Sequence, residues 1–536
     1  MASSPPASDP TPASAPPPQG QSSSSTSGRR QVNASAMASN PDHPKKPINL
    51  MRGWPSTHLL PVAALDAASR RLLANPSLAH PALLYGPDPG FEPLRGALAA
   101  WLADFYGGGT GSSDVERVAV SGGASQSVAC ILQSFTDPEY TRAVWMVAPC
   151  YFLACPIFAD AGFGAGRLRA VPEDEEGIEL GMLEAGLRKM DDDERGKERE
   201  TKCCYKDPGP HRKLYRHVIY CVPSFSNPSG KTMTLRRRQG LLELARRYDA
   251  LVICDDVYDM LQWQPTTTTS TSKTEAGPDL NKALLPRLTD LERPLGPSPH
   301  DPPGKSFGHA VSNGSFSKLV GPGLRTGWTE STPDLAYGLS QTGSTRSGGA
   351  PSQFSAAVVY ELLVSGGLAA HLQKELRPAY RRRHGLVVET ARKQLPASLY
   401  HSSTPQAQDD DGNGMSMMTR TGLTQTLAGR DDVFGGYFVW FRLPGNLKAN
   451  EVAKRCQVEE NLAIGTGGLF AVQGDPHGPQ FENEVRLCFA WEDEADLVDG
   501  VTRLGGVVRR MLEGVPPMEE VAGAGSRGGK GVDELK

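Results

Sequence analysis

The chain has 536 residues, of which 22% are charged, and its formal net charge is -4 at pH 7. This length favours two or three domains, the weak net charge offers no basic field for nucleic acid, and no apolar run is long enough to span a membrane. The nine cysteines show no CxxC pair and no metal-ligand spacing, so we expect free thiols, no metal site and a cytoplasmic protein.

Composition marks the parts of the chain that lie outside the folded core. Residues 1–46 are mainly Ser, Pro and Ala, which bury too little apolar surface to offset the entropy of ordering, so we expect a disordered tail. Residues 517–536 are interpreted as a second flexible tail. Three further segments resemble solvated surface insertions: the charge-rich 190–213, the Thr- and Pro-rich 264–305, and the Asp-, Gly- and Ser-rich 402–432.

The elements expected between these segments alternate between helix and strand. A helix begins at Pro93, because apolar residues then recur every three or four positions. Residues 118–132 predict a strand, a glycine turn and a second helix. The backbone amides of Ser125 and Gln126 would lie at the N-terminus of that helix, where an anion binds well.

Three later strands end in polar side chains. Each has a run of apolar residues followed by a turn, and in an open α/β sheet the carboxyl ends of such strands carry the ligand chemistry. The side chains delivered in this way by the strands near 143, 218 and 251 are Tyr151, Asn227, Asp255 and Tyr258.

The turn Ser-Phe-Ser-Lys-Leu-Val-Gly-Pro-Gly-Leu-Arg at 315–325 combines an amine with phosphate ligands. Ser315, Ser317 and Arg325 are suited to hold a phosphate, the arginine by a two-pronged, charge-assisted contact. Lys318 would lose its proton readily if it is desolvated and lies beside the positive charge of Arg325. The sequence therefore predicts a nucleophilic lysine next to a phosphate site.

Helices interleaved with short apolar strands imply a mainly parallel sheet covered by helices on both faces. We expect a three-layer α/β large domain at 90–345, a smaller α+β C-terminal domain at 346–516, and an N-terminal arm at 47–89. The strand Val-Arg-Leu-Cys-Phe-Ala contains Arg486, which is either a half-buried functional cation or a solvent-facing strand residue.

These motifs together resemble the class I/II, fold type I aminotransferases that use pyridoxal 5'-phosphate. The resemblance runs from Ile-Asn-Leu-Met-Arg-Gly-Trp-Pro at 48–55, through the stretch 83–102, to 485–493, and covers nearly all of the chain except its tails and insertions. Within the family it looks closest to the 2-aminoadipate and kynurenine aminotransferase branch. The stretch 465–480 departs from the family by lacking the proline that usually opens this loop, which leaves the shape of the substrate pocket open.

The resemblance implies a role for each candidate residue. Lys318 would form a Schiff base with the cofactor and move the proton at the substrate Cα, Asp255 would pair with the pyridine nitrogen, and Tyr258 would bond the phenolate oxygen of the ring. The implied cofactor-binding residues are Ser125, Gln126, Tyr151, Asn227, Asp255, Tyr258, Ser315, Ser317, Lys318 and Arg325, with Tyr85 reaching the phosphate of the neighbouring subunit. The implied substrate-binding residues are Gly53, Asn227 and Arg486, the last gripping the α-carboxylate.

The implied function is a transaminase of amino acid metabolism, active in biosynthesis. It would move an amino group from an α-amino acid to a 2-oxo acid by a ping-pong mechanism. The resemblance also implies a homodimer in which the arm at 47–89 joins the small domain and the subunit interface. A β-lyase or decarboxylase would use the same Lys318, and a non-catalytic ligand sensor is the alternative from another class. A sensor of this kind needs a DNA-binding head, which residues 1–46 do not provide.

Overall fold

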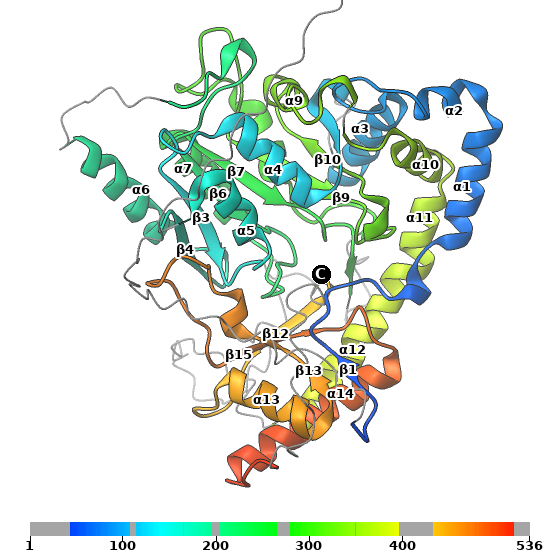
Figure 1. The fold of residues 1–536 in the computed structure, drawn as a ribbon, viewed down its shortest axis with the longest axis vertical. Coiled ribbons are helices and arrows are strands. Elements are labelled where there is room, and N and C mark those ends of the chain that lie inside the picture. The colour runs from blue at the N-terminus through cyan, green and yellow to red at the C-terminus, as the bar shows by residue number, and fades with distance from the viewer. Residues whose placement is uncertain are drawn as a thin grey trace, which may run out of the picture.

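The computed structural model describes residues 43–107, 114–164, 166–195, 204–264, 279–348, 350–395 and 433–518. They form a large body around one extended sheet and a smaller body below it in Figure 1, which the N-terminal arm joins. The predicted insertion 402–432 and almost all of both predicted tails lie outside the described residues.

The large body is built on an eight-stranded sheet. In spatial order the strands are β2 (Val118–Ser121), β10 (Gly327–Glu330), β9 (Ala310–Ser315), β7 (Ala250–Asp255), β6 (His217–Cys221), β3 (Ala143–Ala148), β4 (Leu168–Asp174) and β5 (Gly177–Ile178). Strands β4, β3, β6, β7 and β9 run parallel. Strand β10 is antiparallel to both of its neighbours, and β5 is antiparallel to β4.

Helices cover both faces of this sheet, because alternate strand residues point to opposite sides. The helices of the large body are α3 (Glu92–Tyr106), α4 (Ala124–Phe135), α5 (Ala154–Phe158), α6 (Leu180–Arg195), α7 (Leu235–Arg247), α8 (Leu288–Glu292) and α9 (Pro333–Ser340). On β3, Val144 and Met146 pack in the core with α4, α5 and α9, whereas Trp145 and Val147 pack with α6, α7 and α8.

The small body combines the C-terminal part of the chain with the arm. Strand β1 (Ile48–Asn49) of the arm pairs in parallel with β13 (Leu462–Ala463). A separate sheet has the order β12 (Phe438–Arg442), β15 (Glu484–Cys488), β14 (Gly465–Thr466), and the ribbon of β8 (Gln262–Trp263) with β11 (Phe434–Gly435) links the two bodies. The remaining helices are α1 (Val62–Ala74), α2 (Pro76–Ala82), α10 (Gln353–Val364), α11 (Gly367–His371), α12 (Arg377–Gln394), α13 (Ala449–Glu460) and α14 (Glu494–Leu512).

The last residues of the predicted N-terminal tail belong to the folded small body. Lys45 forms an ion pair with Glu460 of α13, and the ammonium of Lys46 lies 2.6 Å from the carboxylate of Asp496 in α14. The prediction that the tail extends to residue 46 is therefore wrong at its end. The local sequence around Lys45 and Lys46 contains only lysine and proline, and it does not indicate their acidic partners, which lie more than 400 positions later.

The predicted insertion 264–305 is not a solvated loop in its second half, so that prediction is wrong for residues 279–305. They contain α8, whose Glu292 is buried and accepts the backbone N–H groups of His309 and Ala310 at 2.6 and 3.1 Å. These amides start β9, the strand that leads to Lys318. Helix α8 therefore fixes one end of a central strand.

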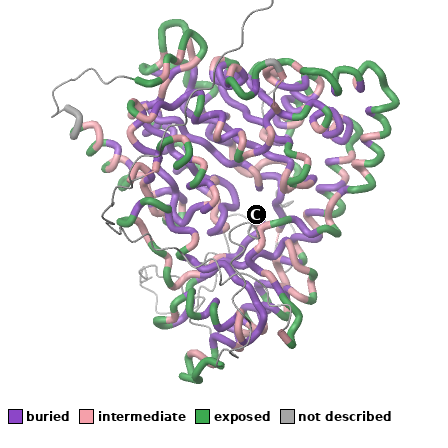
Figure 2. Tube along the Cα trace, viewed as in Figure 1, coloured by how far each residue is buried: buried purple, intermediate pink, exposed green. Residues whose placement is uncertain are grey.

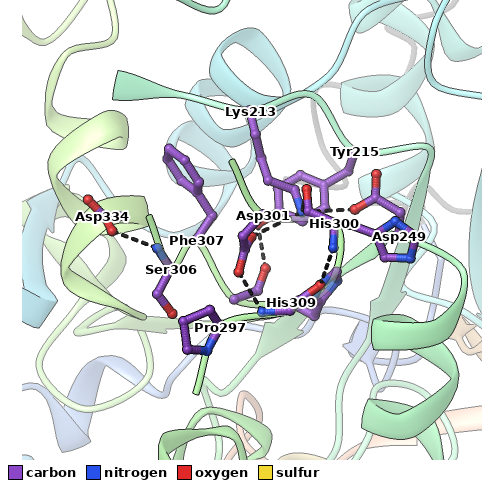
Figure 3. Close-up of polar contacts among 12 residues, drawn as sticks. Lys213, Tyr215, Asp249, Pro297, His300, Asp301, Ser306, Phe307, His309 and Asp334 are labelled. Atoms are coloured by element: carbon purple, nitrogen blue, oxygen red, sulfur yellow. Dashed lines mark hydrogen bonds and ion pairs between the residues drawn. The ribbon is translucent and has the colours of Figure 1, made fainter. Parts of the chain in front are cut away.

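The end of the predicted insertion 190–213 is also anchored. The ammonium of Lys213 is buried, 2.9 Å from Asp249 and 3.3 Å from Asp301, and lies 4.4 Å from the ring centroid of Tyr215. Figure 3 shows these side chains converging beside His309. The contacts attach the segment around Asp301 to the large body.

Burial follows the three layers. In Figure 2 the buried trace runs through the sheets of both bodies, whereas the outer helices and loop tips are exposed. Among the described residues, no single helix has both the length and the apolar character needed to cross a membrane, and one bent pair, Gln353–Val364 with Gly367–Gln394, satisfies the criteria when its two helices are combined.

Candidate active site

A cavity of about 240 Å³ lies where the carboxyl ends of the parallel strands face the small body. Its wall comes from the ends of β7 and β9, the first turn of α4, the arm, and strands β12 and β15. The predicted site residues that line it are Gly53, Ser125, Tyr151, Asn227, Asp255, Tyr258, Ser315, Ser317, Lys318, Arg325 and Arg486.

Two predicted residues do not line this cavity. The side chain of Gln126 turns back, and its Oε1 accepts the backbone N–H of Gly122 at 3.0 Å, so only its backbone amide remains near the helix N-terminus. Tyr85 is 88% exposed and lies beside Phe354, away from the cavity of its own chain. The expected contact of Tyr85 with a neighbouring subunit stays a prediction.

Lys318 lies in the turn after β9, and its Nζ donates a hydrogen bond to the backbone carbonyl of Gly53 at 2.8 Å. The pKa of Lys318 is lowered to about 8, mainly by burial and in smaller part by the charge of Arg486, while Cys488 and Asp255 oppose the shift. The expectation that Arg325 supplies the neighbouring positive charge is wrong, because that charge comes from Arg486 of the small body. The result is an amine that is partly neutral near physiological pH.

Asp255 ends β7 and is held by neutral donors on both oxygens. The hydroxyl of Tyr220 donates to Oδ2 at 2.8 Å, and Asn313 Nδ2 donates to Oδ1 at 3.2 Å. Burial raises the pKa of Asp255 to about 6, while these two donors and the charge of Lys318 act in the opposite direction. Tyr220 of β6 and Asn313 of β9 were missed from the sequence, because nothing in either strand indicates that these side chains face Asp255 on the strand between them.

The opposite end of the cavity gathers donors suited to a phosphate. Helix α4 starts after Gly123, so the first N–H groups of the helix have no partner within it. A Cβ at Gly123 would lie 2.6 Å from a guanidinium nitrogen of Arg325, and the hydroxyl of Ser315 donates to that of Ser317 at 2.9 Å. Gly123 has φ +99°, a value that also favours glycine.

Arg486 is fully inside the protein, so its interpretation as a solvent-facing strand residue is wrong. Its Nη1 donates to Asn227 Oδ1 at 2.9 Å, and Nη2 donates to the carbonyl of Met51. The guanidinium carbon lies 4.1 and 4.5 Å from the ring centroids of Phe438 and Phe470. Burial lowers the pKa of Arg486 to about 10.

The guanidinium of Arg486 is poised for an external anion. Within the described part of the chain it forms no ion pair, and its Nε has no hydrogen-bond partner. Phe470, which covers it, comes from the stretch 465–480 whose missing proline left the pocket shape open. In the structure this stretch forms β14 and a 3-10 turn, Gly467–Phe470.

Two tyrosines complete the polar wall. Tyr151 follows β3, and burial raises its pKa to about 12. Tyr258 is 3% exposed and packs against the rings of Tyr437 and Phe438, with centroids 5.6 and 6.2 Å apart. Tyr437, also missed from the sequence, donates its hydroxyl to the carbonyl of Lys318 at 3.1 Å.

The donor set fits pyridoxal 5'-phosphate. The glycine at 123 leaves space in front of Arg325 that any Cβ would fill, next to the serine hydroxyls and the α4 amides that suit a phosphate. The buried carboxylate of Asp255 suits a protonated ring nitrogen, and the amine of Lys318 suits an aldehyde. Among the described residues there is no group of three or more His, Cys, Asp or Glu side chains that could hold a metal ion.

Comparisons with known proteins identify the family to which this fold and sequence correspond. The family described as aminotransferase class I and II matches residues 45–504. An uncharacterized protein of Saccharomyces cerevisiae is 32% identical over 480 residues, covering 87% of this chain and 97% of the yeast protein.

Solved structures show the same fold. The α-aminoadipate aminotransferase of Thermus thermophilus, complexed with N-(5'-phosphopyridoxyl)-L-leucine, has a TM-score of 0.61 and 26% identity, covering 87% of this chain and 93% of its own. A kynurenine aminotransferase of Pyrococcus horikoshii has a TM-score of 0.62 and 24% identity, covering 87% and 91%.

Proposed function

The chain belongs to the class I and II aminotransferase family, and from that premise we propose that it transfers the amino group of an α-amino acid to a 2-oxo acid by a ping-pong mechanism in which Lys318 carries the cofactor. The fold type I architecture, the transaminase class and pyridoxal 5'-phosphate as cofactor were predicted correctly. The observation that supports the mechanism most strongly is a buried amine of lowered pKa that shares one cavity with a buried carboxylate and a buried guanidinium.

Bound pyridoxal 5'-phosphate supplies an aldehyde that condenses with amines and a ring that accepts the electron pair released at the substrate Cα. Asp255 holds a proton at the ring nitrogen, and Tyr220 and Asn313 fix the direction of its oxygens. Neutral Lys318 would take the proton from the substrate Cα and deliver it to the cofactor carbon that carries the aldehyde, and it would move a proton in the opposite direction in the second half of the transfer. A pKa of about 8 suits both steps near neutral pH.

Arg486 binds the α-carboxylate of the substrate. Its two-pronged guanidinium fixes both the position and the rotation of that group, which aligns the Cα–H bond. Asn227 and the carbonyl of Met51 hold the guanidinium, and the rings of Phe438 and Phe470 exclude water from it. We also propose that Asn227 and Tyr258 donate hydrogen bonds to the phenolate oxygen of the cofactor ring.

We place the enzyme in the cytoplasm and describe it as a homodimer. The eight described cysteines are all free, which agrees with a reducing compartment. Exposed apolar side chains gather on the arm, α2 and α10, where contact with a second copy would cover them: Leu83, Leu84, Tyr85, Phe354 and Val364. Light scattering coupled to gel filtration tests the dimer, and a monomer with full activity would contradict it.

A direct test uses the purified, cofactor-loaded protein. A panel of amino donors is mixed with 2-oxo acids, and both the new amino acid and the new 2-oxo acid are quantified by mass spectrometry. We expect equimolar formation of the two products, and borohydride should fix the cofactor on a peptide that contains Lys318. Release of carbon dioxide or ammonia instead of transfer would indicate a decarboxylase or a β-lyase, and cofactor on another lysine would contradict the proposal.

A further inference from the structure

A buried pair of tyrosines in the small body lies behind Lys318 and has no role in the mechanism above. Tyr437 directly precedes β12, and Tyr380 lies in α12; both side chains are fully buried. Their ring centroids are 5.0 Å apart, and their hydroxyl oxygens are 3.0 Å apart. A buried hydroxyl is unfavourable unless it forms hydrogen bonds, so the partners of both hydroxyls matter.

The direction of these hydrogen bonds follows from the number of protons available. The hydroxyl of Tyr437 donates to the backbone carbonyl of Lys318 at 3.1 Å, because a carbonyl can only accept. Tyr437 has no second proton, so the hydroxyl of Tyr380 donates to the oxygen of Tyr437. Burial raises the pKa of Tyr437 well above its ordinary value, so its proton stays in place near neutral pH. The two hydroxyls form one directed chain that ends on the backbone of Lys318.

Tyr437 is itself held in a fixed position. Its carbonyl accepts the backbone N–H of Phe489 at 3.0 Å, and the N–H of the preceding Gly436 donates to the carbonyl of Leu261 at 3.1 Å. Strand β12, which follows Tyr437, pairs with β15, where Trp440 lies opposite Arg486. The hydroxyl therefore projects from the same pair of strands that carries the proposed carboxylate-binding residue.

The turn that carries Lys318 meets Tyr437 in two places. Three successive backbone N–H groups after Lys318 donate to the carbonyl of Phe316: those of Leu319, Val320 and Gly321. The carbonyl of Lys318 accepts from the other body of the protein, through Tyr437. The Nζ of Lys318 also lies 5.1 Å from the centroid of the Tyr437 ring. One residue thus contacts the lysine at its backbone and at its amine.

We propose that Tyr437 is a positioning residue, whose hydroxyl fixes the backbone of Lys318 and whose ring borders the amine, so that the amine meets the cofactor aldehyde in the orientation that bond formation requires. The inference rests on the proposed function, in which Lys318 carries the cofactor. In that step the neutral amine nitrogen bonds to the aldehyde carbon, and one molecule of water leaves. Tyr437 exchanges no proton in the step and acts by limiting the directions from which the nitrogen approaches.

The test compares two variants that each remove one hydroxyl from the same buried pair, Tyr437→Phe and Tyr380→Phe. Pyridoxal 5'-phosphate is added to each cofactor-free protein, and bond formation to Lys318 is followed by absorbance. We expect Tyr437→Phe to form the bond about tenfold more slowly than the wild type, because Lys318 loses its backbone contact. Tyr380→Phe keeps that contact, so its rate should stay within about twofold of the wild-type rate.

Pyridoxine 5'-phosphate separates the alignment of Lys318 from the binding of the cofactor. It has an alcohol in place of the aldehyde and cannot form the bond. We expect it to bind the wild type and both variants with equal affinity in calorimetry, which also shows that the cavity of each variant is folded. In steady-state transamination, kcat of Tyr437→Phe should fall about tenfold, whereas KM for the amino donor should change by less than about twofold.

Three results would overturn the role of Tyr437. They are equal slowing of bond formation in both variants, an unchanged rate in Tyr437→Phe, and a loss of pyridoxine 5'-phosphate affinity in Tyr437→Phe that accounts for its slower reaction. If no transamination is found but Tyr437→Phe still slows the bond to Lys318, the proposed function fails and the role of Tyr437 stands.

Discussion

Each charged side chain in the cavity is held by neutral groups. Asp255 is bonded by a hydroxyl and an amide, and Lys318 and Arg486 donate to backbone carbonyls. Burying a charge without an opposite charge is unfavourable, so these residues lower the stability of the cofactor-free protein. A ligand that brings a phosphate, a ring nitrogen and a carboxylate supplies the missing partners.

This arrangement predicts that Lys318→Met stabilises the cofactor-free protein. The pKa of Lys318 falls from 10.5 to about 8, so at pH 7 the folded state disfavours the charged amine that the unfolded chain carries. Removing that charge should raise the free energy of unfolding by up to about 3 kcal/mol at pH 7. Chemical denaturation of both cofactor-free proteins measures the difference. A less stable variant would mean that the hydrogen bond to Gly53 outweighs the burial of charge.

Tyr220→Phe should impair catalysis, although the proposed mechanism gives Tyr220 no contact with the substrate. The variant loses the hydroxyl that donates to Asp255, so the carboxylate is less stabilised and its pKa rises above about 6. We expect kcat to fall about tenfold and the acidic limb of its pH profile to move to higher pH. Tyr215→Phe is the control, since it also loses a buried hydroxyl bond, to the carbonyl of Gly308, outside the cavity. Equal effects of the two variants would argue against a role for Tyr220.

Arg486→Lys should weaken every α-amino acid donor to a similar extent. The variant keeps a positive charge but loses the two-pronged contact, so kcat/KM should fall by roughly ten- to hundredfold, and much less for simple amines that lack a carboxylate. Kinetics with several amino acids and one primary amine give the comparison. Equal losses for the amine would assign Arg486 a purely structural role.

The sequence allowed some of these residues to be predicted and not others, for a physical reason. Asp255 ends an apolar strand, where the fold places ligand chemistry, and Lys318 lies among serines in a glycine- and proline-containing turn, so local pattern was enough. Tyr220 and Asn313 form hydrogen bonds with Asp255 from neighbouring strands. Local composition does not predict which residues of two neighbouring strands lie side by side. The positive charge beside Lys318 comes from Arg486, 168 positions later and in the other body.

At the scale of elements, composition failed where a polar segment carries a few deeply buried residues. The segment 279–305 has the proline and charge content of a loop, yet α8 lies in it and Glu292 bonds the first amides of β9. The alternation of strands and helices was easier to predict, since it rests on apolar periodicity that spans many residues. Single buried carboxylates leave no such pattern.

Glu292→Leu should therefore destabilise the large body. Two buried amides of β9 lose their acceptor, which costs about 2–4 kcal/mol of the free energy of unfolding. Thermal and chemical denaturation measure the loss. Deletion of 266–277 is the contrasting variant, because its Thr- and Ser-rich composition still predicts a solvated loop. An unstable deletion variant would contradict the prediction that 266–277 is a solvated loop. Normal stability of Glu292→Leu would contradict the structural role of Glu292.

At the scale of the whole molecule, buried histidines tie stability to pH. His309 is fully buried, and burial lowers its pKa to about 3. In the unfolded chain His309 becomes protonated below pH 6.5, whereas in the folded protein it stays neutral down to about pH 3. The contribution of this site to folding stability is therefore complete above pH 6.5 and is lost as the pH falls from 6.5 towards 3. Lys213 and His300 lie nearby and add positive charge against protonation.

His309→Gln should make the protein less sensitive to acid. Between pH 7.5 and pH 5 the wild type should lose about 2 kcal/mol more of its free energy of unfolding than the variant. Denaturant unfolding of both proteins at both pH values measures this difference. Comparing how much the free energy of unfolding of each protein changes between the two pH values removes the pH-independent effect of the substitution. Identical pH dependence in the two proteins would show that His309 does not remain neutral in the folded state.

The arm gives the enzyme a contact that changes of amino acid do not easily erase. Between β1 and Gly53 the chain meets Arg486 and Lys318 through main-chain carbonyls, which every residue type possesses. Another apolar side chain of similar size could therefore replace the buried Met51 while the carbonyl acceptor stays in place. The contact depends on the path of the backbone, which is held by Asn49 and by pairing with β13.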